Sequence, residues 1–216
     1  MGIQGLHVDD EPDFTDMTAA FLERQNDRFT VETAANAEEG LERLGENEYD
    51  CVVSDYDMPG KNGIEFLEAV REEFPELPFI LFTGKGSEEV ASDAITAGVT
   101  DYLQKGSGTQ GYELLTNRIE NAVRARRNAK RAERQDELMR LTEIAGNTGG
   151  FELDVETGEL FLTDGARRIA GVPEGEDFRI EDAIESYHPD DRERVREVLG
   201  RVTETGKEAH EVFRSQ

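Results

Sequence analysis

Four short apolar runs in this chain each lead to a residue that can do chemistry. The acid pair Asp9-Asp10 follows the first run, Asp55 the second, Thr83 the third and Lys105 the fourth. Carboxylates held close together repel and raise one another's pKa unless a hard divalent cation binds among them. A carboxylate is also a nucleophile that forms covalent intermediates. These residue types predict a magnesium site that presents one carboxylate for attack.

The four runs have the composition of buried β-strands, and helical periodicity fills the stretches between them. The strands are expected at residues 6–8, 51–54, 79–82 and 102–104, with another at 29–33. Helices are expected at 12–25 and 37–45, from about residue 64 to before Pro75, and at 88–97. Alternating strands and helices predict an α/β domain with a parallel sheet, whose ligands bind at the carboxyl edge of the strands. The reactive residues should therefore converge on one crevice.

Residues 1–120 resemble the receiver domain of two-component response regulators. The motifs that carry the resemblance are V-D-D-E-P at 8–12, V-V-S-D-Y-D-M-P-G at 52–60, L-F-T-G at 81–84 and D-Y-L-Q-K-G at 101–106. The resemblance implies a flavodoxin-like, doubly wound, five-stranded parallel sheet of strand order 2-1-3-4-5. One departure is that Lys105 precedes Gly106, where the family usually has proline.

The resemblance also assigns roles. Asp55 would be the phosphoacceptor, attacking a phosphoryl group carried by a partner histidine kinase or phosphotransfer protein. Mg²⁺ would be held by Asp10 directly, by Asp9 largely through water, by Asp55, and by the backbone carbonyl of Asp57. Lys105 and Thr83 would bind the phosphoryl group and complete the catalytic set.

A switch and an enzyme class are implied as well. Tyr102 would move inward as Thr83 moves, and this would repack the face around the fourth and fifth strands. The resemblance implies self-phosphorylation and dephosphorylation at most, and no kinase motif is found in these residues.

Two other functions remain open. Asp55-Tyr56-Asp57 is a D-x-D after an apolar strand, as in haloacid-dehalogenase-like phosphatases, although those usually place it on the first strand and need no upstream acid pair. A receiver fold can also serve as an interaction module that works without phosphorylation. The intact acidic, hydroxyl and lysine set favours the phosphoryl-accepting switch.

The composition is strongly acidic. Asp and Glu number 49 against 24 Lys and Arg, giving a formal net charge of −25. Such a chain repels nucleic acid and anionic membranes, so neither is an expected partner. Few lysines among many acids resemble the proteins of salt-in halophiles, and a haloarchaeal source is hypothesised. The single Cys51 excludes an internal disulfide, and no signal peptide or ~18-residue apolar run is found, so a cytoplasmic location is expected.

Residues 112–145 have the pattern of one long helix, an extended signalling linker. It holds the main basic stretch of the chain, namely Arg118, Arg124, Arg126, Arg127, Lys130, Arg131 and Arg134. Apolar 3-4 spacing is interrupted by Arg126 and Glu133, so the coiled-coil signal is weak. Ion pairing with an acidic partner subunit is favoured over nucleic-acid binding, and the helix offers a surface for a homodimer.

Residues 146–216 resemble the N-terminal part of a PAS domain, an α+β fold. The resemblance rests on G-F-E-L-D at 150–154, T-D-G-A-R-R-I-A-G-V-P at 163–173 and H-P-D-D-R at 188–192. A hairpin over 150–163, a short helix at 165–170, a helix at 192–205 and a third strand containing His210 and reaching 216 are expected. The PAS fold would be truncated there, leaving an unpaired edge through which the segment could dimerise.

Overall fold

The computed structural model describes residues 2–84, 88–106, 109–154, 157, 159–173, 179–206 and 209–214. The chain divides into two compact units, residues 1–131 and 132–216.

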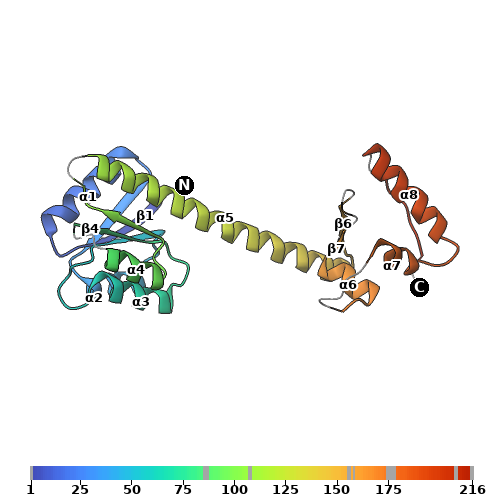
Figure 1. Ribbon diagram of the computed structural model, residues 1–216, viewed down its shortest axis with the longest axis horizontal. Coiled ribbons are helices and arrows are strands. Elements are labelled where there is room, and N and C mark those ends of the chain that lie inside the picture. Colours follow the sequence, from blue (N-terminus) through green and yellow to red (C-terminus); the bar gives the residue numbers. More distant parts are fainter. Residues whose placement is uncertain are drawn as a thin grey trace. The chain divides into compact units, whose positions relative to one another are not determined.

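The first unit is built on a five-stranded parallel sheet with the order β2-β1-β3-β4-β5. Figure 1 shows this sheet between two layers of helices. Its strands are β1 Ile3–Val8, β2 Phe29–Ala34, β3 Cys51–Ser54, β4 Phe79–Thr83 and β5 Asp101–Gln104. Its helices are α1 Pro12–Gln25, α2 Ala37–Glu46, α3 Gly63–Glu73, α4 Glu88–Thr96 and α5 Gln110–Gly146. The predicted sheet order and alternation of elements are confirmed.

Helices cover both faces of this sheet. One apolar cluster joins the sheet to α1 and α5 through side chains such as Leu22, Leu115 and Ile119. The other joins it to α2, α3 and α4 and contains Phe66 and Phe79, which are fully buried with ring centroids 5.4 Å apart. Burying a side chain of this size stabilises the fold by about 1.5–3 kcal/mol. The strand ends are thus fixed on a rigid double-sided core.

Local capping sets where α3 begins, directly after the loop that follows β3. The Asn62 side chain accepts from the backbone N–H groups of Ile64 at 2.9 Å and Glu65 at 3.0 Å. The Glu65 carboxylate accepts in return from the Asn62 N–H at 2.8 Å. This reciprocal capping box satisfies donors that the first helical turn leaves open. It anchors one end of the loop that carries Asp55 and Asp57.

The second unit contains the end of α5, a small hairpin and three further helices. The hairpin pairs β6 Phe151–Leu153 with β7 Leu160–Leu162 in antiparallel fashion, and α6 Asp164–Ala170, α7 Ile180–Glu185 and α8 Arg192–Thr205 follow. The hairpin and the helices at 164–170 and 192–205 agree with the sequence prediction. The short helix α7 was not predicted.

Buried Glu143 joins the end of α5 to the hairpin and α6. Its carboxylate accepts from the Thr163 hydroxyl at 2.5 Å, and from the N–H groups of Gly150 at 3.2 Å and Gly165 at 3.0 Å. Charge-assisted hydrogen bonds of this kind are stronger than neutral ones. Glu143 therefore links the end of α5 to the hairpin and to the start of α6.

The expected third strand near the end of the chain is a wrong prediction for the described residues. Residues 209–214, including His210, are neither helix nor strand. Instead the Arg214 carbonyl accepts from the His188 N–H at 2.8 Å, and the Arg214 guanidinium pairs with Asp191 at 2.8 Å. The backbone groups of a strand need a neighbouring strand as hydrogen-bond partner. Here the Arg214 carbonyl is hydrogen-bonded by the first residue of the H-P-D-D-R turn. Residues 215–216 lie outside the described part.

Candidate functional site: a carboxylate–lysine cluster at the sheet edge

The strand ends carry the predicted reactive residues to one edge of the sheet. Val8 at the end of β1 lies opposite Ser54 at the end of β3. Asp9 and Asp55, the next residues of the two adjacent strands, therefore lie side by side. The Asp55 N–H donates to the Val8 carbonyl at 2.8 Å and fixes this arrangement. On the other side, Thr83 of β4 lies opposite Gln104 of β5, immediately before Lys105.

Lys105 is the centre of the cluster. Its ammonium lies 2.6 Å from Asp9 Oδ2 and 2.8 Å from Asp55 Oδ1. It also lies 4.1 Å from the centroid of the Phe14 ring, a cation–π contact from the first turns of α1. The replacement of the family's proline by Gly106 thus leaves the lysine within reach of both carboxylates.

The electrostatics of the cluster follow from burial. Asp9 is 1% exposed and Asp55 6% exposed. Burial raises the pKa of the Asp9 carboxyl, and the negative charge of Asp55 adds to this rise. The hydrogen bonds from the Lys105 ammonium and the Glu11 N–H offset only part of it. Burial opposes the charge on Lys105 too, but its hydrogen bonds to Asp55 and Asp9 outweigh this and raise its pKa. The ammonium therefore stays charged at neutral pH.

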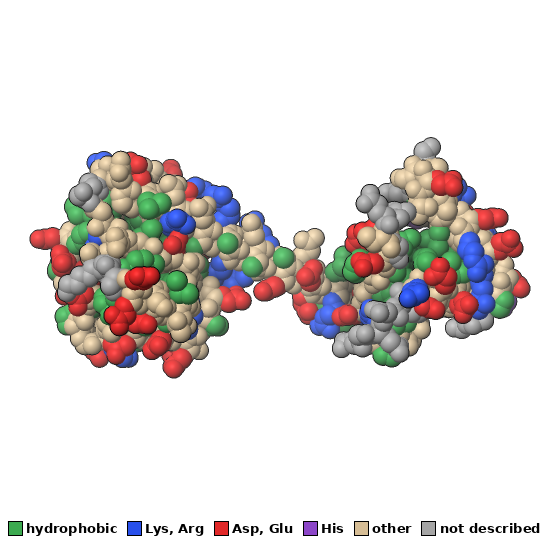
Figure 2. Space-filling model, viewed as in Figure 1, with side chains coloured by type: hydrophobic (Ala, Val, Ile, Leu, Met, Phe, Trp, Pro, Cys, Tyr) green, Lys and Arg blue, Asp and Glu red, His purple; other side chains and the backbone are tan. Residues whose placement is uncertain are grey.

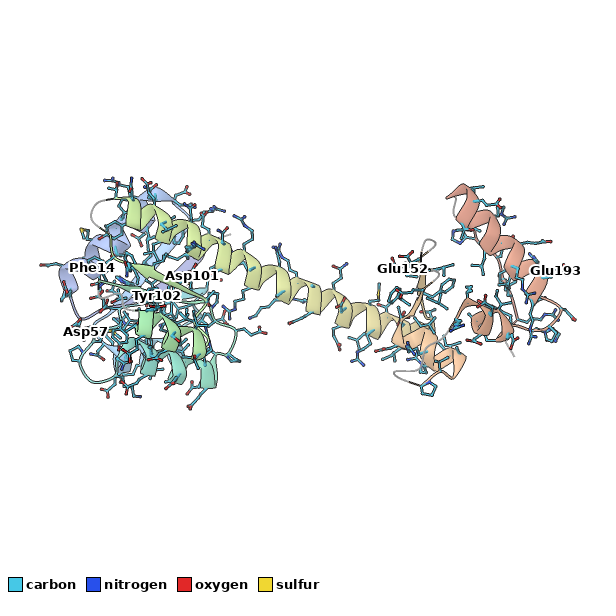
Figure 3. All side chains as sticks on the ribbon, viewed as in Figure 1. Phe14, Asp57, Asp101, Tyr102, Glu152 and Glu193 are labelled. Carbon is cyan, nitrogen blue, oxygen red and sulfur yellow. The ribbon has the colours of Figure 1, made fainter. Side chains whose placement is uncertain are left out.

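The other two predicted metal residues lie at the rim. Asp10 and Asp57 are both exposed, and the Asp57 N–H donates to Asp55 Oδ2 at 2.8 Å. Figure 3 labels Asp57 in the loop that follows β3. In the described residues no group of three His, Cys, Asp or Glu side chains is arranged to hold a metal ion. The structure brings Asp9, Asp55 and Lys105 together and leaves Asp10 on the surface.

Thr83 and Tyr102 occupy the neighbouring strands. Thr83 is 1% exposed, and its carbonyl accepts from the Lys105 N–H at 2.8 Å. Tyr102 is half-buried and packs against the apolar core cluster that joins the sheet to α2, α3 and α4. Its hydroxyl is buried and finds no hydrogen-bond partner among the described residues. Thr83 ends β4 and Tyr102 lies on the neighbouring strand β5, so both residues are close to the carboxyl ends of the strands.

Several residues of the site were missed from the sequence. Phe14 was missed because an aromatic residue in the first turns of a helix is normally interpreted as core; its place just after the acid pair was the available signal. His7 is fully buried 6.1 Å from the Phe14 ring, and burial lowers its pKa to about 4. Gly63 packs on the Asp55 carbonyl. No sequence pattern distinguishes this glycine from an ordinary helix start.

The strand order and the carboxylate–lysine cluster define a signalling domain of the receiver type. The family model described as the response regulator receiver domain matches residues 6–117, and the chain belongs to this family. No helix in the described part of the chain has both the length and the apolar character needed to cross a membrane.

Similar proteins include the nitrogen assimilation regulatory protein NtrX of Azorhizobium caulinodans, 29% identical over 140 residues, or 64% of this chain and 29% of that protein. The transcriptional regulatory protein ResD of Bacillus subtilis is 35% identical over 100 residues, or 46% of this chain and 40% of that protein. The chain thus spans less than half the length of these relatives.

Among solved structures, a CheY-like receiver domain protein of Methanospirillum hungatei matches with a TM-score of 0.55 and 26% identity, covering 60% of this chain and 99% of that one. The receiver domain dimer of NtrC4 in its beryllofluoride-activated form matches with a TM-score of 0.51 and 28% identity, covering 57% and 98%.

Proposed function

We propose that this chain is a phosphorelay receiver in which Asp55 accepts a phosphoryl group from a histidine of a partner kinase or phosphotransfer protein. The observation that carries the proposal is the bridge of Lys105 between Asp9 and Asp55 at the ends of adjacent strands. Membership of the receiver family supports it. A partly buried lysine held between two buried carboxylates places a positive charge where phosphoryl transfer to a carboxylate develops negative charge.

The chemistry follows from these positions. An Asp55 carboxylate oxygen attacks the phosphorus, the P–N bond to the donor histidine breaks, and the imidazole leaves with its electron pair, so that an acyl phosphate forms. Phosphoryl transfer depends on positioning and on neutralising charge on the transferred oxygens. The Lys105 ammonium supplies a positive charge beside Asp55, and the Thr83 hydroxyl is the nearby donor on β4 for a phosphoryl oxygen.

The donor set also fits Mg²⁺, because Asp9, Asp10 and Asp55 offer only hard oxygen ligands. The Asp57 backbone carbonyl would add another. When bound, the ion neutralises charge on the phosphoryl oxygens.

We further propose that phosphorylation is read out through Thr83, Tyr102 and α5. Tyr102 lies on β5 opposite Leu81 of β4, two residues before Thr83, so movement at one strand end is passed to the other. The continuous helix α5 would carry the change to a PAS-like second unit, and a homodimer through these parts would amplify it. An interaction module that works without phosphorylation is the alternative.

The proposal is tested by incubating the full chain with acetyl phosphate, a small phosphoryl donor, and Mg²⁺ in KCl. The mass of the intact chain is then measured by mass spectrometry. A single added phosphoryl group, lost in Asp55→Asn and without Mg²⁺, is expected. The matched control Asp13→Asn removes an exposed acid of α1 and should leave labelling unchanged. Folded protein that accepts no phosphoryl group from acetyl phosphate or from a phosphorylated histidine kinase would favour the interaction module.

A further inference from the structure

A groove lined by arginines lies at the opposite edge of the first unit from the carboxylate cluster. It encloses about 180 Å³ between the start of β1 and the part of α5 that follows Glu120. Four of its lining side chains are arginines and one is a carboxylate, namely Arg28, Arg124, Arg127, Arg131 and Glu120. The chain as a whole has twice as many acids as bases, so this local excess of cations stands out.

The groove is built by helix geometry. Arg124, Arg127 and Arg131 are three and four residues apart and therefore share one face of α5. Arg28 faces them from the loop that leads into β2, beside Ile3. Figure 2 shows Lys and Arg side chains gathered along this helix, whereas most charged side chains on the rest of the visible surface of the unit are acidic.

Two of these arginines are fixed by the fold. Arg127 donates to the Gly2 carbonyl at 2.6 Å and to Asp50 Oδ2 at 2.8 Å. Arg28 pairs with Glu120 at 3.2 Å, and Glu120 also accepts from the Asn26 amide at 2.6 Å. The wall of the groove therefore already has its charges partly oriented before any ligand binds.

The other two arginines are available to a ligand. Arg124 and Arg131 are exposed, and neither forms an ion pair with a carboxylate in the described part of the chain. Guanidinium groups gathered on one face repel one another, and an anion between them relieves that repulsion. A planar guanidinium binds the oxygens of a phosphate in bidentate fashion.

We propose that this groove binds a small phosphate-class oxyanion, with Arg124 and Arg131 as its direct ligands and Arg127 and Arg28 as the oriented wall. The size argues for a small ligand, since pockets for drug-sized molecules enclose about 300–1,000 Å³. The site lies at the end of the sheet opposite Asp55 and is separate from the phosphoacceptor.

Calorimetric titration of the full chain with pyrophosphate tests this, without divalent cations and at constant ionic strength. Saturable binding of one pyrophosphate per chain is expected, weakened about tenfold or more in Arg124→Gln/Arg131→Gln. The matched control Lys130→Gln removes one positive charge from the same helix outside the groove and should change the affinity less than about twofold. Circular dichroism confirms that each variant folds.

Three results would overturn the proposal. One is the absence of saturable binding to folded protein. Another is equal weakening by Lys130→Gln, which would show a diffuse field in place of a site. The third is binding of a glutamate-rich peptide, but not of pyrophosphate, through the same arginines, which would make the groove a protein-docking surface. The phosphate groups bound in the groove belong either to a nucleotide or to a free oxyanion, and titration with adenosine diphosphate distinguishes the two. Tighter binding of adenosine diphosphate than of pyrophosphate would identify a nucleotide, and weaker binding would identify a free oxyanion.

Discussion

Replacing Gly63 by alanine should distort the loop that carries the proposed phosphoacceptor. A Cβ at this position would lie 2.3 Å from the Asp55 carbonyl oxygen, 2.8 Å from Leu81 Cδ2 and 3.0 Å from Tyr56 Cα. Ordinary contacts of a Cβ are 3.4–4 Å, so α3 and the loop must separate by about 1 Å. Two of the three obstacles are backbone atoms that side-chain rotation cannot move. Overpacking of this kind costs about 1–3 kcal/mol.

Gly45→Ala is the matched control. Gly45 lies in helix α2, and nothing lies within 4 Å of the position that an added methyl group would take. The same substitution there should raise the free energy of unfolding by about 0.5–1 kcal/mol, because alanine favours the helix more than glycine does. Both substitutions add one methyl group, so their opposite signs isolate the effect of the contact with Asp55.

Urea unfolding and labelling by acetyl phosphate measure the two consequences. Gly63→Ala should unfold at lower urea than the wild type and accept the phosphoryl group more slowly, because Asp55 is displaced relative to Lys105. Gly45→Ala should be labelled at the wild-type rate. If Gly63→Ala were as stable as the wild type and labelled as fast, the close packing of α3 on the Asp55 carbonyl would be refuted.

Four more outcomes are expected. Lys105→Met should slow labelling about 10²-fold in a rate assay, since it removes charge stabilisation at the transferred group. His7 is neutral in the folded chain, so between pH 6.5 and pH 4 its imidazole takes up a proton mainly in the unfolded chain. The free energy of unfolding should therefore fall by about 3 kcal/mol from pH 6.5 to pH 4. In His7→Leu the free energy of unfolding should depend less on pH over this range. The fully buried Cys51, whose pKa burial raises, should react with thiol reagents only as the chain unfolds. The melting temperature should rise with KCl if the acidic surface is salt-adapted.

The fold of the first unit could be predicted from the sequence because its signals are local and mutually consistent. Apolar runs of three and four residues set β3 and β4, and Pro12 marks the start of α1, where its fixed φ suits the helix. The convergence of Asp9, Asp55 and Lys105 follows from the rule that parallel strands end at one edge.

The details that escaped prediction depend on packing between distant parts of the chain. The contact of Phe14 with Lys105 and the closeness of Gly63 to Asp55 require a three-dimensional arrangement that no periodicity encodes. The expected strand near His210 was wrong because strand-like composition forms a strand only where a neighbouring strand pairs with it. Asp10 lies on the surface because it is one residue beyond the buried Asp9.

The most direct test of the central claim is to find which side chain carries the phosphoryl group. Borohydride reduction of the labelled chain converts a phosphoaspartate to homoserine, and peptide mass spectrometry then locates the change. Reduction is expected at Asp55 alone, and it should be lost when Mg²⁺ is withheld. Reduction at Asp9, Asp10 or Asp57 in folded wild-type protein would contradict it.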